Sequence, residues 1–357
     1  MARGLVESQI ESEGSHCMQL DLIKDREAFQ ALESEWNQLV PKSTMDVPFL
    51  RHEFLRVWWE TLGGGEWKSG DLRIIIARDE QGHLAAIAPL FRTYNEEGDP
   101  VLMFIGSVEI ADYLDLIVRK ESSAHFIRLL LDELGKYDEL EWSKLDLYNL
   151  PDWSETTDLL RVEAEGHGWK VREKLLQPCP LITLDAGWSG YLSSLDKKQR
   201  HELKRKMRRM DAQPEGIRFR IVNHTDDIEK ETDAYLRLMA YDPKKAAFLS
   251  SAMRSNIRAL IRAGLKNNWL MLTFLDIGDQ PAAVSMNFDY GNRIWVYNSG
   301  ILPAYHALSP GWVLLGYTIR WAAENGREAL DFMRGDEVYK YRLGGVDRFI
   351  KHIEISR

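Results

Sequence analysis

Several signatures of large protein classes are missing from this sequence. Its two cysteines, Cys17 and Cys179, lie far apart without metal-ligand spacing, which argues against a disulfide framework or a cysteine zinc site and fits a reducing compartment. No apolar run approaches the roughly 18–20 residues of a membrane-spanning helix, so no integral membrane association is expected. Residues 1–17 are polar and acidic, without an apolar stretch behind a basic start. We therefore expect a disordered leader rather than a secretory signal, and a cytoplasmic protein.

Catalytic and ligand-binding motifs are also scarce. The histidines show no H-x-x-x-H or H-E-x-x-H spacing, so the sequence predicts no metal dependence. A G-x-S-x-G elbow, a P-loop and a G-x-G-x-x-G fingerprint are all absent, which disfavours those hydrolases and nucleotide-binding proteins. The net charge of −9 disfavours a general DNA-binding protein.

The length of the chain and an internal similarity indicate two domains. Its 357 residues favour two domains over one. Two predicted hairpins resemble each other, with D-E-Q-G-H-L-A-A-I-A at 79–88 and D-I-G-D-Q-P-A-A-V-S at 276–285. The order of the surrounding elements repeats as well, although the few identities also fit chance. We place the boundary near residue 178, giving domains at 18–178 and 179–357.

The most charged stretch is a basic helix predicted over residues 191–210. Its apolar residues fall on one helical stripe, which leaves the remaining surface cationic. The pattern fits a solvated face, a seat for an anionic ligand, or a surface for nucleic acid or anionic membrane. Candidate anion-binding residues on this helix are Lys198, Arg200 and Arg205.

A second informative stretch runs from residue 293 to residue 347. It is predicted as a strand at 293–298, a loop, a helix at 312–325 and a strand at 329–334. Ser309 is the expected N-cap, with Pro310 in the first turn. This arrangement fits either a well-capped helix or free N–H groups that face a pyrophosphate.

The end of that stretch concentrates acids, bases and phenols within residues 331–342. One interpretation is a charged turn with local ion pairs. The other is acyl transfer, in which an attacking amine loses a proton to a carboxylate and a donor stabilises the oxyanion. Residue types for both roles are present, but their spacing does not assign the roles.

Three motifs in this half resemble a known family. Residues 191–205 read Y-L-S-S-L-D-K-K-Q-R-H-E-L-K-R, residues 308–315 read L-S-P-G-W-V-L-L, and residues 331–342 read D-F-M-R-G-D-E-V-Y-K-Y-R. They are similar to signatures of CelD-like acetyltransferases of the GNAT superfamily, which are associated with polysaccharide (cellulose) biosynthesis and related to FemAB-type transferases. The first half matches only in its order of elements and in D-Y-L-D at 112–115.

The resemblance implies an α/β fold of two tandem GNAT-like (acyl-CoA N-acyltransferase) domains. Each would be a mixed, mostly antiparallel sheet flanked by helices. It also implies acetyl-CoA or another acyl-CoA as the donor. The usual pyrophosphate loop, Q/R-x-x-G-x-G/A, is absent, which leaves an acyl-carrier protein or an aminoacyl-tRNA as alternative donors.

The same resemblance suggests roles for individual residues. Lys340, near Gly344, is the first catalytic candidate, with Asp336 or Glu337 as the base and Tyr339 as a weaker candidate acid. The expected cofactor-binding residues are Tyr297, Asn298, Ser299, Ser309, Gly311 and Trp312. Further candidates for binding substrate or anions are Asp331, Arg334 and Arg342.

The predicted function is an acyltransferase that moves an acyl group, in the first place acetyl, to an amine or hydroxyl of a small-molecule or sugar acceptor. Two alternatives stay open: a non-catalytic glycan-binding or scaffold protein of the same fold, and an aminoacyl-tRNA-dependent transferase. The acceptor and the oligomeric state do not follow from the sequence.

Overall fold

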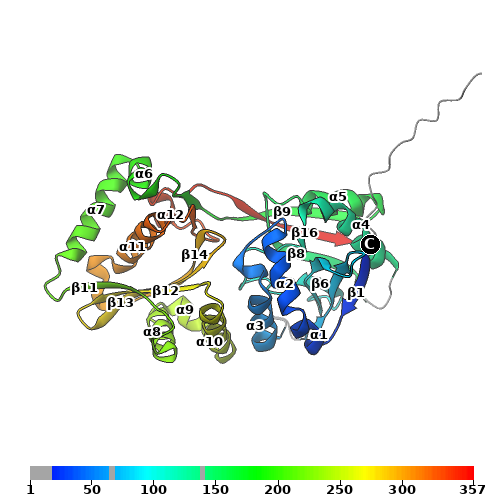
Figure 1. Cartoon of the computed structure of the whole chain (residues 1–357), viewed down its shortest axis with the longest axis horizontal. Coiled ribbons are helices and arrows are strands. Elements are labelled where there is room, and N and C mark those ends of the chain that lie inside the picture. The colour runs from blue at the N-terminus through cyan, green and yellow to red at the C-terminus, as the bar shows by residue number, and fades with distance from the viewer. Residues whose placement is uncertain (1–17, 64–68, 137–140) are drawn as a thin grey trace, which may run out of the picture.

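The computed structural model describes residues 18–63, 69–136 and 141–357, so the predicted leader lies outside the described residues. Figure 1 shows two α/β units side by side, one built mainly from each half of the chain. The elements of the first half are β1 (Gln19–Ile23), α1 (Arg26–Ala31), α2 (Glu33–Leu39), α3 (His52–Leu62), β2 (Asp71–Leu72), β3 (Ile74–Arg78), β4 (Leu84–Ala88), β5 (Leu90–Tyr94), β6 (Pro100–Phe104), β7 (Ile117–Val118), α4 (Ser123–Lys136), β8 (Lys144–Pro151), α5 (Thr156–Gly166) and β9 (Lys170–Pro178).

The second half continues with a similar alternation of helices and strands. Its elements are β10 (Leu181–Thr183), α6 (Gly187–Ser194), α7 (Lys197–Asp211), β11 (Ile217–Ile221), α8 (Ile228–Met239), α9 (Pro243–Phe248), α10 (Ser251–Lys266), β12 (Leu270–Ile277), β13 (Gln280–Tyr290), β14 (Arg293–Ile301), the short 3₁₀ helix η5 (Pro303–Leu308), α11 (Pro310–Glu324), β15 (Ala329–Asp331), α12 (Val338–Arg342) and β16 (Phe349–Ser356).

Both units are mixed sheets in which most neighbouring strands are antiparallel. The second unit has the strand order β10-β15-β14-β13-β12-β11, and the first has β2-β5-β6-β8-β16-β9 beside a smaller sheet, β1-β3-β4-β7. Each unit contains one strand–helix–strand crossover that joins parallel strands: β6–α4–β8 in the first and β14–α11–β15 in the second. The predicted fold class is confirmed, and both predicted hairpins, β3–β4 and β12–β13, are present.

Helices cover both faces of the second sheet. The apolar stripe of α7, formed by Leu203, Met207 and Met210, packs with α6 and α11 over one face. Helices α8 and α10 lie on the other face, and their buried residues join the core of the first unit. The packing surface of α8 and α10 therefore links the two units into one molecule.

The last strand of the chain lies in the sheet of the first unit. β16 pairs antiparallel with both β8 and β9, and Figure 1 shows it crossing from one unit to the other. Its side chains explain the insertion, because Ile353 and Ile355 alternate into the core and a bulge before Ile353 lets Ile350 share that face. A boundary near residue 178 thus separates the helices of the two halves but not their sheets.

Two details of the predicted elements are wrong. The helix expected over residues 191–210 is broken near Leu195, where α6 ends and Asp196 caps α7 by accepting a hydrogen bond from the Gln199 N–H (2.9 Å). The strand expected over 329–334 ends at Asp331. Among the described helices, none combines the length and apolarity needed to cross a membrane.

Because β16 ties the end of the chain into the first sheet, its core residues should stabilise the whole molecule. Ile353→Ala should lower the free energy of unfolding by about 2–5 kcal/mol, since the side chain is fully buried. Urea unfolding followed by circular dichroism measures the change, with Lys351→Ala on the same strand as the control, expected to cost less than about 1 kcal/mol. A loss below about 1 kcal/mol for Ile353→Ala would contradict this packing.

Candidate functional site

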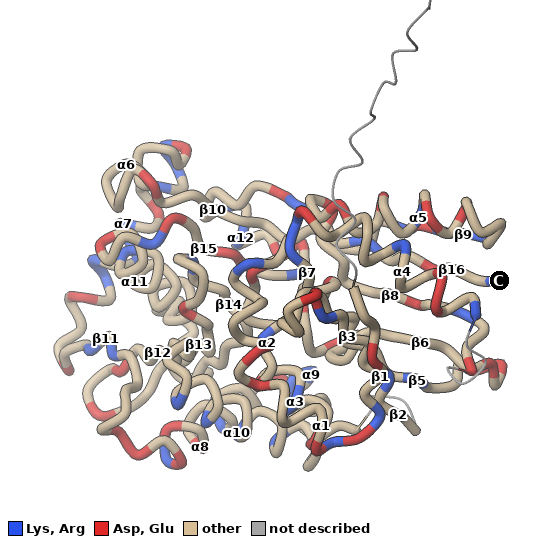
Figure 2. The backbone as a smooth tube through the Cα atoms, turned by 45° about the vertical axis from the view of Figure 1, so that its right-hand side comes forward, with Lys and Arg blue, Asp and Glu red and all other residues tan. Residues whose placement is uncertain are grey.

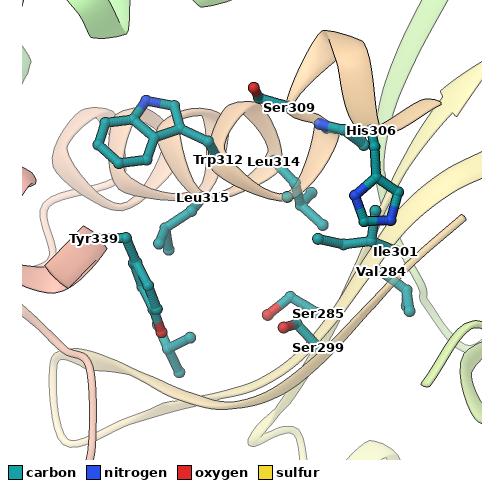
Figure 3. A pocket seen from close by; sticks show the side chains of 13 residues that line it. Val284, Ser285, Ser299, Ile301, His306, Ser309, Trp312, Leu314, Leu315 and Tyr339 are labelled. Atoms are coloured by element: carbon teal, nitrogen blue, oxygen red, sulfur yellow. The ribbon is translucent and has the colours of Figure 1, made fainter. Parts of the chain in front are cut away.

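A cavity of about 360 Å³ lies in the second unit between β13, β14 and the start of α11. Its volume falls within the range of small-ligand sites. The lining residues are Val284, Ser285, Val296, Ser299, Ile301, His306, Ser309, Pro310, Gly311, Trp312, Leu314, Leu315 and Tyr339. Figure 3 shows Ser285 and Ser299 on the strand side, facing Leu314 and Leu315 of the helix, with Tyr339 at one side. The site therefore combines apolar side chains on the helix with two hydroxyl groups on the strand wall.

The strand that forms one wall has an open edge. β15 pairs with β14 only through Arg293–Ala329, Ile294–Leu330 and Trp295–Asp331. From Val296 to Ile301, β14 keeps β13 as its neighbour, and among the described residues no strand covers its other side. An exposed strand edge offers backbone N–H and C=O groups to an extended ligand. An amide-containing chain could bind along this edge.

The start of α11 supplies backbone donors at the same place. Ser309 is the N-cap residue with Pro310 in the first turn, as predicted, but it has a left-handed conformation (φ 55°) and its side chain makes no capping hydrogen bond. The N–H groups of Gly311 and Trp312 have no hydrogen-bond acceptor within the described part of the chain. Gly311 also allows close packing, because a Cβ there would lie 2.6 Å from Ile301 Cδ1. The helix start is thus available to an anion.

Two cations of the basic helix α7 reach this helix start. Lys206 Nζ donates a hydrogen bond to Ser309 Oγ (3.0 Å) and lies 5.0 Å from the centre of the Trp312 ring. Arg209 Nη1 donates to the Ala307 carbonyl (3.2 Å). Figure 2 shows how densely Lys and Arg occur along α7, in a chain whose net charge is negative. Positive charge is therefore concentrated beside the cavity.

The short helix α12 forms the remaining wall. Tyr339 lines the cavity, and burial, followed by the neighbouring Glu337 carboxylate, raises the pKa of its phenol above the ordinary value. Like any phenol it is protonated at neutral pH, and it can donate a hydrogen bond to a group in the cavity. This placement is compatible with its predicted role.

Lys340, the first predicted catalytic residue, does not line the cavity. Its side chain is buried, and Nζ donates to the carbonyls of Met333 (2.9 Å), Arg334 (2.6 Å) and Gly335 (3.1 Å). It also forms an ion pair with Glu337 (2.8 Å). With all its donors occupied, Lys340 holds the loop after β15 against α12. The geometry gives it a structural role in place of the predicted contact with the reacting carbonyl.

Asp331 and Arg334 lie in the contact between the two units, away from the cavity. The Tyr113 hydroxyl donates to both carboxylate oxygens of the buried Asp331 (3.0 Å each). Arg334 forms an ion pair with Asp112 (2.6 Å) and also donates to the carbonyls of Val108 and Glu109. We call these two pairs the inter-unit clamp. The predicted anion-binding role of Asp331 and Arg334 is thus corrected, because their polar groups are already engaged.

Other predicted residues are dispersed. Tyr297 donates its hydroxyl to the Ile110 carbonyl of the first unit, and Asn298 accepts from the Ser299 N–H. Arg200 is directed at carbonyls near the end of α6, and Arg205 is paired with Glu202. Lys198, Arg205 and Arg342 line a separate surface hollow, and Asp336 is exposed. Of the predicted cofactor residues, Ser299, Ser309, Gly311 and Trp312 do line the cavity.

Sequence reasoning missed four residues at or beside this site: Ser285, Lys206, Arg209 and His306. Lys206 and Arg209 are three residues apart and so share one face of α7. That spacing was readable, but the sequence did not show which face of the basic helix meets the loop before α11. No motif marked Ser285 or His306.

The clamp makes a prediction about pH and stability. Burial raises the pKa of Asp331 from 3.8 to about 7, so ionisation favours the unfolded chain as pH rises from about 4 to 7. Asp331→Asn stays neutral and keeps the acceptor for Tyr113. Relative to the original protein it should gain roughly 4 kcal/mol of stability between pH 4 and pH 8, at 1.36 kcal/mol per pKa unit. Urea unfolding at several pH values tests this, and a difference independent of pH would refute it.

The contacts of Lys340 predict a structural effect. Lys340→Met would leave three carbonyls without their donor and should lower the free energy of unfolding by roughly 3 kcal/mol. The exposed Arg342 lies on the same helix, and Arg342→Met should cost less than about 0.5 kcal/mol. Thermal unfolding of both variants decides the matter. A Lys340→Met protein of full stability that has lost turnover would instead support the predicted catalytic role.

The site lies in a segment that matches a known protein family. Residues 197–341 match the family model described as an acetyltransferase (GNAT) domain. The matched segment begins with α7 and ends in α12, so it includes the cavity and all its walls. The comparison with curated proteins gives no match.

Solved structures similar to this chain include a conserved protein of unknown function from Bacteroides thetaiotaomicron (TM-score 0.60, 9% identity, covering 95% of this chain and 100% of that one). Another is FemX (TM-score 0.54, 11% identity, 90% and 95% covered). A third is the C-terminal domain of a putative lysylphosphatidylglycerol synthetase from Agrobacterium fabrum (TM-score 0.57, 9% identity, 92% of each chain). At these identities the likeness concerns the fold, and it extends over both units. Residues 197–341 therefore have the GNAT fold and are similar to an acetyltransferase domain.

Proposed function

We propose that the protein is an acyltransferase that takes an acyl group, in the first place acetyl, from acyl-CoA and passes it to an amine or hydroxyl of a small-molecule or sugar acceptor. The observation that carries the proposal is the cavity between the open edge of β14 and the uncapped start of α11. An acyl-CoA has an extended, amide-containing arm and a diphosphate. The open strand edge suits the arm, and the helix start suits the anion.

The charges beside the cavity support the seat for the diphosphate. Lys206 and Arg209 lie at the loop before α11, and the free N–H groups of Gly311 and Trp312 lie in its first turn. Lys206 already donates a hydrogen bond to the Ser309 hydroxyl, which places a cation at this loop. Such a site can bind a diphosphate without the usual glycine pattern, which the sequence lacks.

The residues around the cavity also supply groups for the chemistry. The Tyr339 phenol, which is protonated at neutral pH, can donate a hydrogen bond to the departing sulfur. The hydroxyls of Ser285 and Ser299 lie on the strand wall and can orient the acyl group. Glu337 is exposed next to Tyr339 and, with Asp336, is retained as a predicted base. The resemblance to CelD-like proteins supports a sugar acceptor in polysaccharide biosynthesis.

A second candidate function is aminoacyl transfer. Two proteins of similar fold, FemX and the putative lysylphosphatidylglycerol synthetase, favour it by their names. The cationic α7 beside the cavity would then contact an aminoacyl-tRNA, or else the acidic surface of an acyl-carrier protein. Binding of tRNA that falls steeply with salt, together with no binding of acyl-CoA, would favour this function.

Calorimetric titration with acetyl-CoA tests the primary proposal. We expect binding to the original protein, and Lys206→Met should weaken it on the order of tenfold, because one charged hydrogen bond to a phosphate is lost. Lys204→Met is the matched control, since Lys204 is exposed on the same helix and does not contact the loop before α11. Equal affinity in Lys206→Met and Lys204→Met would remove Lys206 from the site. Absence of any binding by the original protein would overturn acyl-CoA as the donor.

A further inference from the structure

A second cavity, of about 250 Å³, adjoins the first across β14. Its lining residues are Leu238, Tyr241, Asp242, Pro243, Lys245, Ser299, Gly300, Ile301, Pro303 and His306. Three of these, Ser299, Ile301 and His306, also line the first cavity. The two cavities therefore meet at the open-edged end of β14, and the second is formed mainly by the end of α8, by α9 and by the loop after β14.

One amine projects to the place where the cavities meet. Lys245, in α9, donates a hydrogen bond from Nζ to the Ser299 carbonyl (2.6 Å). Ser299 belongs to the stretch of β14 that has lost β15 as a neighbour. Lys245 therefore lines the second cavity, and its amine contacts Ser299, which lines both cavities. Its neighbour Lys244 is exposed, which makes the placement of Lys245 specific.

The surroundings of Lys245 lower the pKa of its amine relative to that of an ordinary lysine. Burial is the largest influence and lowers its pKa, while the carboxylates of Asp242 and Glu337 act in the opposite direction. Asp242 is partly occupied, because it accepts hydrogen bonds from the backbone N–H groups of Lys244 and Lys245. The other titratable groups at this cavity are Tyr241 and His306. Glu337 reaches from α12 and is itself paired with Lys340.

We propose that the second cavity binds the acceptor, a small primary amine or alcohol with a partly apolar body, and that Lys245 takes the proton from its attacking group. The proposal rests on acyl transfer in the first cavity. It assigns the proton acceptor to Lys245 in place of the predicted bases Asp336 and Glu337, which line neither cavity. The apolar part of the lining, from Leu238, Pro243 and Ile301, would hold the body of the acceptor.

The proposed step balances without any further reactant. The acceptor nitrogen or oxygen forms a bond to the acyl carbon of the thioester, and the carbon–sulfur bond breaks. Neutral Lys245 takes the proton that the acceptor loses. The thiolate leaves and receives a proton, so that the products are an amide or ester and a free thiol. Lys245 returns its proton to the thiolate directly or through solvent and is neutral again.

The protonation of Lys245 can be measured without knowing the acceptor. Trace labelling of the full protein with acetic anhydride over pH 6 to 11, followed by peptide mass spectrometry, gives the pH of half-maximal reactivity for each lysine. Because each lysine is compared with its own plateau, access to the reagent cancels. We expect Lys245 to reach its half-point at a lower pH than Lys244. An equal or higher half-point for Lys245 would overturn its role as a proton acceptor.

Kinetics separate proton transfer from a structural role. With acetyl-CoA as donor and 2-phenylethylamine as the probe acceptor, release of the CoA thiol measures turnover. Lys245→Arg keeps a donor for the Ser299 carbonyl but is permanently protonated and cannot accept a proton, so kcat should fall on the order of 100-fold with the KM for acetyl-CoA unchanged. Lys244→Arg is the control and should be unaffected.

The two proposals fail in different ways. A Lys245→Arg protein with full kcat would overturn the role of Lys245 while leaving the acyltransferase intact. An original protein that neither binds acetyl-CoA nor releases thiol would overturn the proposed function, and with it the acceptor assignment, whatever the labelling shows. Melting temperatures of both variants establish that they are folded before the rates are compared.

Discussion

The buried contact between Asp331 and Tyr113 is the interaction on which the site depends. Asp331 is the last residue of β15 and also the partner of Trp295 in the last register pair that β15 makes with β14. The Tyr113 hydroxyl, from the other unit, engages both carboxylate oxygens there. The same residue thus joins the units and marks the point where β14 loses its neighbour. The open edge of β14 therefore begins at a contact between the halves of the chain.

The path of the chain after Asp331 has a second consequence. Arg334 is held by Asp112 of the first unit, Lys340 fixes the loop to α12, and β16 then enters the first sheet. The segment that carries Tyr339 to the cavity is therefore attached to the first unit at both ends. The first half can affect function without binding a ligand, because it fixes the position of one wall of the cavity.

Much of this architecture could be predicted from the sequence, because it is encoded locally. The two hairpins and the helix after β14 follow from periodicity and from turn residues close in the chain. The roles of Asp331, Arg334 and Lys340 could not be predicted, because a run of charged residues reads the same whether it faces a substrate or a buried partner. Their partners Asp112 and Tyr113 are more than 200 residues away from Asp331 and Arg334. Single-sequence patterns do not specify such pairings.

The charges along α7 and around β14 differ between the two sides of the site. On the side of α11, Lys206 and Arg209 contact the loop before the free backbone donors, and no acidic side chain is among the residues that line the first cavity. On the side of α9, Lys245 is accompanied by the carboxylates of Asp242 and Glu337. An anionic donor is thus favoured on one side of β14 only. A neutral nucleophile would enter from the other side, and the narrow strand edge between them is where the two would meet.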